Sequence, residues 1–168
     1  PFVGSAVFDL EPTKMGVLFG LPAFGFFFGN FATAKFSQRL GIDRMILFGT
    51  LSQIFGMGIS LMISLLGFGN ALTFFGFCIF IGFGNGLALA NSSVGMLSIR
   101  PAVAGTASGI GGAIQIGGGA ALAALAGFVL TVSESTYPLQ LIMLLSALMA
   151  FLSIVYVIRR ARFVDSSN

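Results

Sequence analysis

The sequence contains no histidine, no tryptophan and a single cysteine, Cys78, and these shortages exclude several kinds of chemistry. Without histidine there is no imidazole to act as a general base or as a metal ligand. The five acidic residues all lie in predicted loops or near chain ends, so no pair of carboxylates is predicted to act together. A lone cysteine cannot form an internal disulfide, and its apolar neighbours indicate a small buried hydrophobe. We therefore predict no catalytic residue, no metal site and no cofactor.

Charge is scarce as well, and its scarcity points to the solvent in which the chain folds. Only 8% of the residues are charged, whereas soluble domains carry about 25%. Hydrophobic residues make up 57% of the chain, and the mean hydropathy is +1.03. A water-soluble fold cannot hide this much apolar surface, so the sequence predicts an all-α membrane protein. The net charge of +3 is modest and the basic residues are scattered, which argues against a nucleic-acid partner.

Apolar runs long enough to cross a bilayer occur five times. A spanning helix needs about 20 mostly apolar residues. The predicted spans cover residues 16–34, 45–66, 71–97, 104–132 and 138–158. A shorter apolar run over residues 2–8 resembles the end of a helix that begins upstream. We therefore interpret the chain as a fragment of a longer protein.

The basic residues gather on one side of the membrane if successive spans alternate in direction. The connections 35–44 and 98–104 and the C-terminal tail then share a side and hold seven of the eight basic residues. The other side holds Lys14 alone. The positive-inside rule makes the basic side cytoplasmic. The sequence thus predicts a multi-pass protein with a cytoplasmic C-terminus.

The segment 105–127 contains eight glycines and no charge. Small residues recur at every fourth position, the spacing that lets two helix backbones approach closely in a bilayer. The first row begins with three positions that we assign to helix packing: Gly105, Gly109 and Gly117. A phosphate-binding loop is the alternative, but G-x-x-x-x-G-K-[ST] is absent and no strand–turn–helix context surrounds the glycines. We therefore predict a helix that packs tightly against its neighbours.

Three features follow one another in the segment 91–127: Asn91, the Arg100-Pro101 turn and AGTAS at 104–108. This segment resembles the tenth-to-eleventh helix region of major facilitator superfamily transporters. More narrowly, it resembles the bicyclomycin-resistance (Bcr/CflA) group of drug/proton antiporters. The opening from Phe8 to Gly20 is similar to the seventh-to-eighth connection of that group. The resemblance implies the C-terminal six-helix bundle of a twelve-helix transporter, with five full spans and the end of a sixth.

The connection AKFSQRLGIDR, residues 34–44, partly matches the superfamily's cytoplasmic motif G-x-L-x-D-R-x-G-R-R. Three positions fit the motif: Arg39, Gly41 and Arg44. Three positions depart from it: Ala34, Phe36 and Gln38. By resemblance, this cytoplasmic motif loop acts as a latch that forms in one conformation and opens in the other. The alternative, that its charges only set the topology, stays open.

Polar side chains inside a bilayer are costly and therefore mark functional candidates. No Asp, Glu, Lys or Arg lies in the middle of a span. If the protein is a proton antiporter, as the resemblance implies, its coupling acid is expected in the missing half. The resemblance implies that amides line a substrate cavity, and the candidates are Asn85, Gln115, Asn91 and Asn30. The alternative is that these amides bridge helices, which is worth about 0.6 kcal/mol each. We interpret Gln53, on a helix expected to be peripheral, as structural.

The resemblance implies proton-coupled efflux of drugs or other small molecules across the bacterial inner membrane by alternating access. The implied partners are a small-molecule substrate, protons, the lipid bilayer and the protein's own N-terminal six-helix half. Two alternatives stay open: a metabolite or sugar-derivative exporter of the same fold, and a non-transporting membrane subunit. A channel is a third, although no stretch looks like a selectivity filter.

Overall fold

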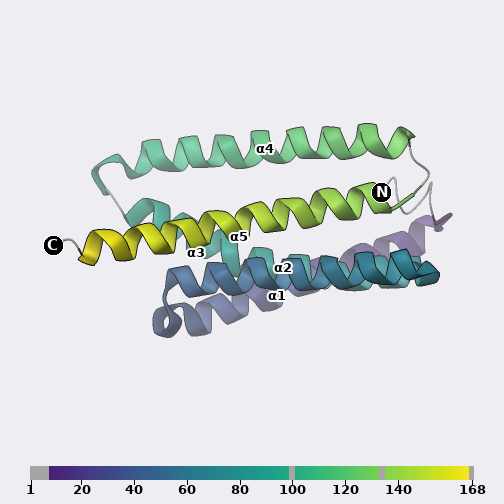
Figure 1. Cartoon of the computed structure of the whole chain (residues 1–168), viewed down its shortest axis with the longest axis horizontal. Coiled ribbons are helices and arrows are strands. Elements are labelled where there is room, and N and C mark those ends of the chain that lie inside the picture. Colours follow the sequence, from purple (N-terminus) through teal and green to yellow (C-terminus); the bar gives the residue numbers. More distant parts are fainter. Residues whose placement is uncertain (1–7, 99–100, 133–134, 167–168) are drawn as a thin grey trace.

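The computed structural model describes residues 8–98, 101–132 and 135–166, and these ranges are helical almost throughout (Figure 1). The long helices are α1 (Pro12–Leu40), α2 (Ile42–Ile63), α3 (Ala71–Ser98), α4 (Ala104–Val132) and α5 (Tyr137–Ser166). A π-helical turn, Ser64–Phe68, extends α2, and a short 3-10 turn, Pro101–Val103, precedes α4. No strand occurs in the described ranges. Each predicted span lies within one observed helix or its extension, so the prediction of five apolar helices is confirmed.

All five helices are long and apolar enough to cross a membrane. Successive helices run in opposite directions, so the α1–α2 turn, the start of α4 and the C-terminal end share one end of the bundle (Figure 1). We call this the basic end, because six described basic residues lie there: Lys35, Arg39, Arg44, Arg159, Arg160 and Arg162. Lys14 lies at the opposite end, and Arg100 falls outside the described residues. This is the architecture of a multi-pass membrane protein.

Helix α3 is the centre of the packing, because α1 and α2 both pack along it. Helix α5 packs mainly on α2, whereas α4 touches α3 and α5 only sparsely. Figure 1 shows α4 set apart from the other helices along much of its length. The chain therefore has a compact three-helix unit, formed by α1, α2 and α3, with α5 and α4 added on one side.

The contact between α1 and α3 is made of backbone. Each helix contributes two glycines spaced four residues apart: Gly25 and Gly29 on α1, and Gly82 and Gly86 on α3. A Cβ atom on Gly25 would clash with the carbonyl oxygen of Ile79. A Cβ atom on Gly82 would likewise clash with the carbonyl oxygen of Pro22. Both helices thus carry the small-xxx-small pattern, which allows close van der Waals packing of the two backbones. Such packing matters in a bilayer, because the hydrophobic effect does not drive helices to associate there.

The glycines of α4 have different surroundings. Gly105, Gly109 and Gly117 are exposed, and apart from the adjoining backbone of α4 no atom lies within 4 Å of a Cβ built on any of them. Their predicted contact with a neighbouring helix therefore has no partner among the described residues, and it stays a prediction. Elsewhere on α4, a Cβ on Gly111 would meet the side chain of Met96 on α3. The close packing of glycines in this chain is found instead between α1, α2 and α3.

Helix α5 is anchored to α2 by a buried amide. The side chain of Gln140 is fully buried, with a relative exposure of 0%, and its Nε2 donates to the hydroxyls of Ser60 and Ser64 at 3.0 Å each. One turn earlier, the hydroxyl of Tyr137 donates to the backbone oxygen of Ser64 at 2.9 Å. These three hydrogen bonds join the first turns of α5 to the C-terminal end of α2, and further along α5 the apolar residues Ala147 and Ile154 are buried.

Candidate functional site

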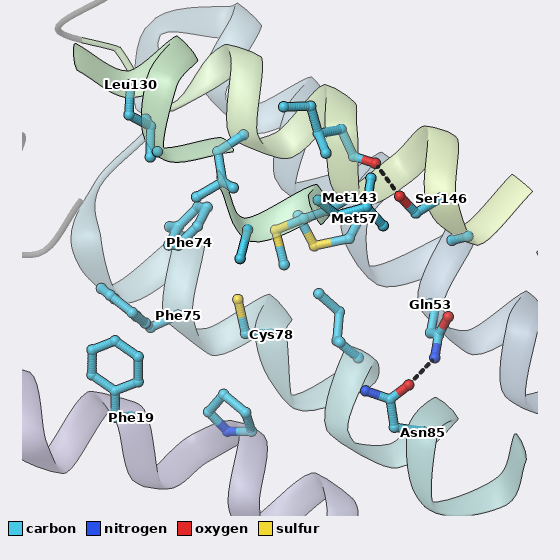
Figure 2. Close-up of a pocket in the computed structure, with 18 residues that line it drawn as sticks. Phe19, Gln53, Met57, Phe74, Phe75, Cys78, Asn85, Leu130, Met143 and Ser146 are labelled. Atoms are coloured by element: carbon cyan, nitrogen blue, oxygen red, sulfur yellow. Dashed lines mark hydrogen bonds between the residues drawn. The ribbon is translucent and has the colours of Figure 1, made fainter. Parts of the chain in front are cut away.

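A cavity of about 650 Å³ lies between the helices, and all five of them contribute to its wall (Figure 2). Helix α3 contributes residues between Phe74 and Asn85, α4 contributes residues between 122 and 130, and α5 contributes residues between 139 and 147. These residues lie in the half of each helix farther from the basic end, except that Gln53 and Asn85 lie at the middle of α2 and α3. The cavity thus occupies one half of the bundle and reaches toward its middle.

The wall is mostly apolar. Phe74 and Phe75 are buried and meet edge to face, with ring centroids 5.1 Å apart. Figure 2 shows Cys78, Met57 and Met143 gathered around the same space. Methionine side chains are flexible and polarisable, and they adapt to irregular shapes. A wall of this kind accepts bulky apolar groups without demanding one shape.

A hydrogen-bonded amide pair supplies the main polar feature of the wall. The Nε2 of Gln53 donates to the Oδ1 of Asn85 at 2.9 Å. Gln53 lies near the middle of α2 and Asn85 near the middle of α3, so the pair sits at the inner end of the cavity. A hydrogen bond between membrane helices contributes about 0.6 kcal/mol on average, so this pair positions groups more than it stabilises the fold.

The glycines that flank Asn85 explain how the two amides meet. A Cβ on Gly84 would lie 2.5 Å from the Cγ of Gln53 and would also clash with the carbonyl oxygen of Gly49. Gly84 therefore allows α2 to approach α3 at this level, and Gln53 can then reach Asn85. On the other face, Gly86 packs against α1. Three alternate glycines, Gly82, Gly84 and Gly86, thus let α3 pack closely on two neighbours around this polar position.

The hydrogen bond between the two amides uses one polar atom of each, and the other polar atom of each amide stays free. Among the described residues, neither the Nδ2 of Asn85 nor the Oε1 of Gln53 has a hydrogen-bond partner. Figure 2 shows the amide nitrogen of Asn85 turned away from Gln53 and toward the cavity. The inner end of the cavity therefore holds a free donor on Asn85 and a free acceptor on Gln53, and the donor is the atom that Figure 2 shows turned toward the cavity.

Asn85 is the only one of the four predicted cavity amides that the described structure places in this wall. Asn91 is buried, with a relative exposure of 2%, and bridges α3 and α1. Its Nδ2 donates to the carbonyl of Leu87 at 2.7 Å and to the hydroxyl of Thr33 at 3.3 Å, and its Oδ1 accepts from the hydroxyl of Ser37. These are the contacts expected of an amide that joins two helices.

The other two predicted amides lie elsewhere. The Nδ2 of Asn30 donates to the carbonyl of Phe26, four residues earlier on the same helix, at 2.9 Å. Gln115 is exposed on α4 and is not among the described residues of the cavity wall. Gln53, which the sequence analysis interprets as structural, takes the place beside Asn85. A signal was present in the sequence, because Gln53 and Asn85 are both amides near the middle of their spans.

The residues of the cytoplasmic motif loop form a tight turn between α1 and α2. Gly41 alone separates the two helices, with a φ of 83°, a conformation that favours glycine. Its backbone N–H donates to the carbonyl of Ser37 at 2.9 Å. Arg39 and Arg44 flank this turn, and both are exposed. The structure thus gives Gly41 a clear local role, while the latch function of the two arginines stays a prediction.

A second hollow, of about 560 Å³, lies between α1, α2 and α3 nearer the basic end. Its described lining is apolar except for Ser52, whose hydroxyl donates to the carbonyl of Phe80 at 3.2 Å. Within the described residues this hollow therefore offers no free polar group to orient a ligand. The cavity that contains Asn85 is the candidate site.

Comparison with known proteins adds no relative: no protein-family model, no curated protein and no solved structure matches this chain. The likeness to facilitator-superfamily transporters therefore rests on the sequence segments quoted above. Among the described residues, no three side chains of Cys, Asp or Glu lie together in a way that would hold a metal ion.

Proposed function

We propose that this chain is one bundle of a proton-coupled exporter of the major facilitator type, which moves small molecules out across the bacterial inner membrane by alternating access. The cavity between the five helices carries the proposal. Its volume of about 650 Å³ falls in the range of about 300–1,000 Å³ typical of small-molecule sites. Its inner end lies near the middle of the helices, where secondary transporters bind their substrates.

The distribution of charge supports an orientation for the proposed exporter. The basic end would face the cytoplasm by the positive-inside rule. The cavity occupies the opposite half of the bundle, so it would lie toward the outer face of the membrane. This arrangement is what the export cycle needs in the state that releases substrate. Rocking of this bundle against a second one would expose the same amide pair to the cytoplasm in the other state.

The proton would be handled outside this bundle. Of the described acids, Asp9, Glu11 and Asp43 lie before α1 or in the first turn of α2, and Asp165 lies at the C-terminal end of α5, so all four are away from the middle of any span. An acid that couples proton movement to transport must lie where the substrate pathway can reach it. We therefore assign the coupling acid to an N-terminal six-helix half, which would also complete the substrate site.

The proposal is tested by efflux in cells that lack their main drug exporters. The protein is expressed with whatever flanking sequence its gene encodes, and the accumulation of fluorescent dyes and antibiotics, both neutral and cationic, is followed with and without a protonophore. We expect lower accumulation of at least one class of compound, and we expect the protonophore to abolish the difference.

Two variants make the efflux measurement specific. Asn85→Leu removes the free donor of the cavity and should raise accumulation toward that of cells without the protein. Ser153→Ala is the control, because the Ser153 hydroxyl bonds within its own helix at 2.8 Å and Ser153 is not among the described residues of the wall. Unchanged accumulation across the whole panel would contradict drug export, and a narrow metabolite carrier or a non-transporting subunit would then be the better explanation.

A further inference from the structure

We infer that the cavity selects uncharged, ring-bearing lipophilic molecules that carry one hydrogen-bond acceptor, such as a ketone oxygen, and that it discriminates against organic cations of the same shape. This inference rests on the proposed function, because it names the class of substrate for the same cavity.

The first step concerns charge. No Asp, Glu, Lys or Arg is among the described residues that line the cavity. A cation that entered would lose most of its hydration and find no counter-ion among these residues. Removing an ion from water costs several kcal/mol even after the protein relaxes. The wall that this chain supplies therefore penalises charge of either sign.

The aromatic rings in the wall do not offset this penalty. A cation over a desolvated aromatic face gains about 2 kcal/mol. Phe75 meets Phe74 edge to face and lies against Phe19 with ring centroids 5.3 Å apart, so these rings are largely engaged with one another. The free-energy cost of desolvating a cation thus exceeds the stabilisation that a cation–π contact with these rings would give. The same rings pack well against a neutral ring system.

The second step concerns the polar group at the inner end. Because the Oδ1 of Asn85 accepts from Gln53, Asn85 turns its Nδ2, a donor, toward the cavity, while the Oε1 of Gln53 remains as an acceptor beside it. A donor in an apolar cavity is costly while unpaired, and it favours a ligand that brings an acceptor to it. An oxygen at one end of an otherwise apolar molecule meets this requirement. A molecule covered in hydroxyls does not, because most of its polar groups would find no partner in the apolar wall.

The third step supplies a way to measure occupancy. Cys78 is the single cysteine of the chain, and it lines the cavity. A ligand in the cavity should therefore shield its thiol from a reagent. The neutral reagent 2,2′-dithiodipyridine forms a mixed disulfide with a thiol and releases one coloured thiopyridone, so the rate of colour release reports the accessibility of Cys78 without any added label.

The experiment uses the purified protein in detergent and three naphthalene probes of nearly the same shape. They are 2-acetylnaphthalene, which carries a ketone; 2-isopropylnaphthalene, which carries no acceptor; and trimethyl(2-naphthyl)ammonium, which carries a positive charge. We expect the ketone to protect Cys78 at a concentration about fivefold lower than the hydrocarbon, the ratio expected of one hydrogen bond. We expect the cation to protect least. Cys78→Ser, which should release no colour, establishes that the signal comes from this thiol.

The double variant Gln53→Leu/Asn85→Leu tests the assigned contact, because Asn85→Leu alone would leave the Nε2 of Gln53 as a new free donor. The double variant should abolish the difference between the ketone and the hydrocarbon while both still protect Cys78, because the apolar wall remains. Ser153→Ala should keep the wild-type order of the three probes. The comparison of the three probes on the unchanged protein decides the inference even if the double variant does not fold.

Two results would overturn the inference: protection by the cation equal to or stronger than that by the ketone, or no protection by any probe. Either result is separate from the fate of the proposed function, which is measured by efflux in cells. Protonophore-sensitive efflux of cationic dyes alone would uphold transport and refute this substrate class. Selective protection by the ketone without any efflux would uphold the binding site and refute transport.

Discussion

Gly82 of α3 packs directly against the carbonyl oxygen of Pro22 on α1, with no room for a side chain between the two backbones. Gly25 repeats this relationship in the other direction, since it meets the carbonyl of Ile79. The two contacts lie beside the cavity, whose wall includes Pro22 and residues of α3. The glycines therefore set the distance between the helices that carry the candidate site.

This packing predicts a strong effect of adding one methyl group. Gly82→Ala should destabilise the protein by about 1–3 kcal/mol, because the new Cβ must displace backbone rather than a flexible side chain. Thermal unfolding in detergent, followed by the loss of helical circular dichroism, measures the change.

Gly117→Ala on α4 is the matched control for Gly82→Ala. Nothing lies within 4 Å of a Cβ at Gly117. Alanine is favoured over glycine in a helix by about 1 kcal/mol, so this change should be neutral or stabilising. If Gly82→Ala were as harmless as the control, the direct backbone contact between α1 and α3 would be wrong.

The amide pair predicts a coupling between two substitutions. In a double-mutant cycle, Gln53→Leu and Asn85→Leu should show an interaction energy of about 0.6 kcal/mol, the average for hydrogen bonds between membrane helices. The pair Gln53→Leu and Asn91→Leu shares no described contact and should be additive within about 0.3–0.5 kcal/mol. Both cycles are measured by unfolding in mixed micelles of increasing SDS content. If the effects of Gln53→Leu and Asn85→Leu were simply additive, the two side chains would not be hydrogen-bonded to each other.

The buried amide between α2 and α5 predicts a difference between two glutamines. Gln140→Ala should destabilise the protein by about 1–3 kcal/mol, because it removes both bonds to Ser60 and Ser64 and leaves a void. Gln115→Ala is the control, since Gln115 is exposed on α4, and it should change stability by less than about 0.5 kcal/mol. Chemical unfolding of the two variants in parallel makes the comparison. Equal effects would show that the α2–α5 contact contributes little to the stability of the bundle.

The number and placement of the helices could be predicted from the sequence because they depend on composition along the chain. The bilayer fixes the length of an apolar run, and the fold of the rest does not alter it. The end of each helix was less predictable. Helix α1 begins at Pro12 and continues to Leu40, beyond the predicted 16–34, because its polar last turn stays helical and the chain turns only at Gly41. Hydropathy alone does not show how far a helix extends beyond its apolar residues.

The partners of the small residues could not be predicted in the same way. A row of glycines tells that a helix face can be approached closely, but it does not tell which helix approaches it. The densest row, at 105–127, faces no described neighbour along Gly105, Gly109 and Gly117, whereas the shorter rows on α1 and α3 meet each other. Partner choice depends on how all the helices fit together, and the spacing of one row does not contain that information.

The candidate site was predicted in part. Asn85 was one of the four amides that the resemblance implied for a substrate cavity, and it does lie in the cavity wall. Gln53 was assigned to the structure of a peripheral helix, but α2 in fact packs between α3 and α5, so its amide reaches the cavity wall. Asn91 looked equally polar, yet Thr33 and Ser37 of α1 satisfy its amide. Whether an amide faces a cavity or a neighbouring helix depends on residues far away in the sequence.

The gathering of charge at one end predicts the topology of the chain in the membrane. The basic end carries Arg39, Arg44 and Arg159, and the positive-inside rule places it in the cytoplasm. A green fluorescent protein fused after the C-terminus should therefore fluoresce, whereas alkaline phosphatase fused there should be inactive. Alkaline phosphatase fused within residues 68–70, at the opposite end, should be active because it folds only outside the cytoplasm. The reverse pattern of fusion activities would show that the bundle has the opposite orientation. The cavity would then lie on the cytoplasmic side, where substrate would enter rather than leave.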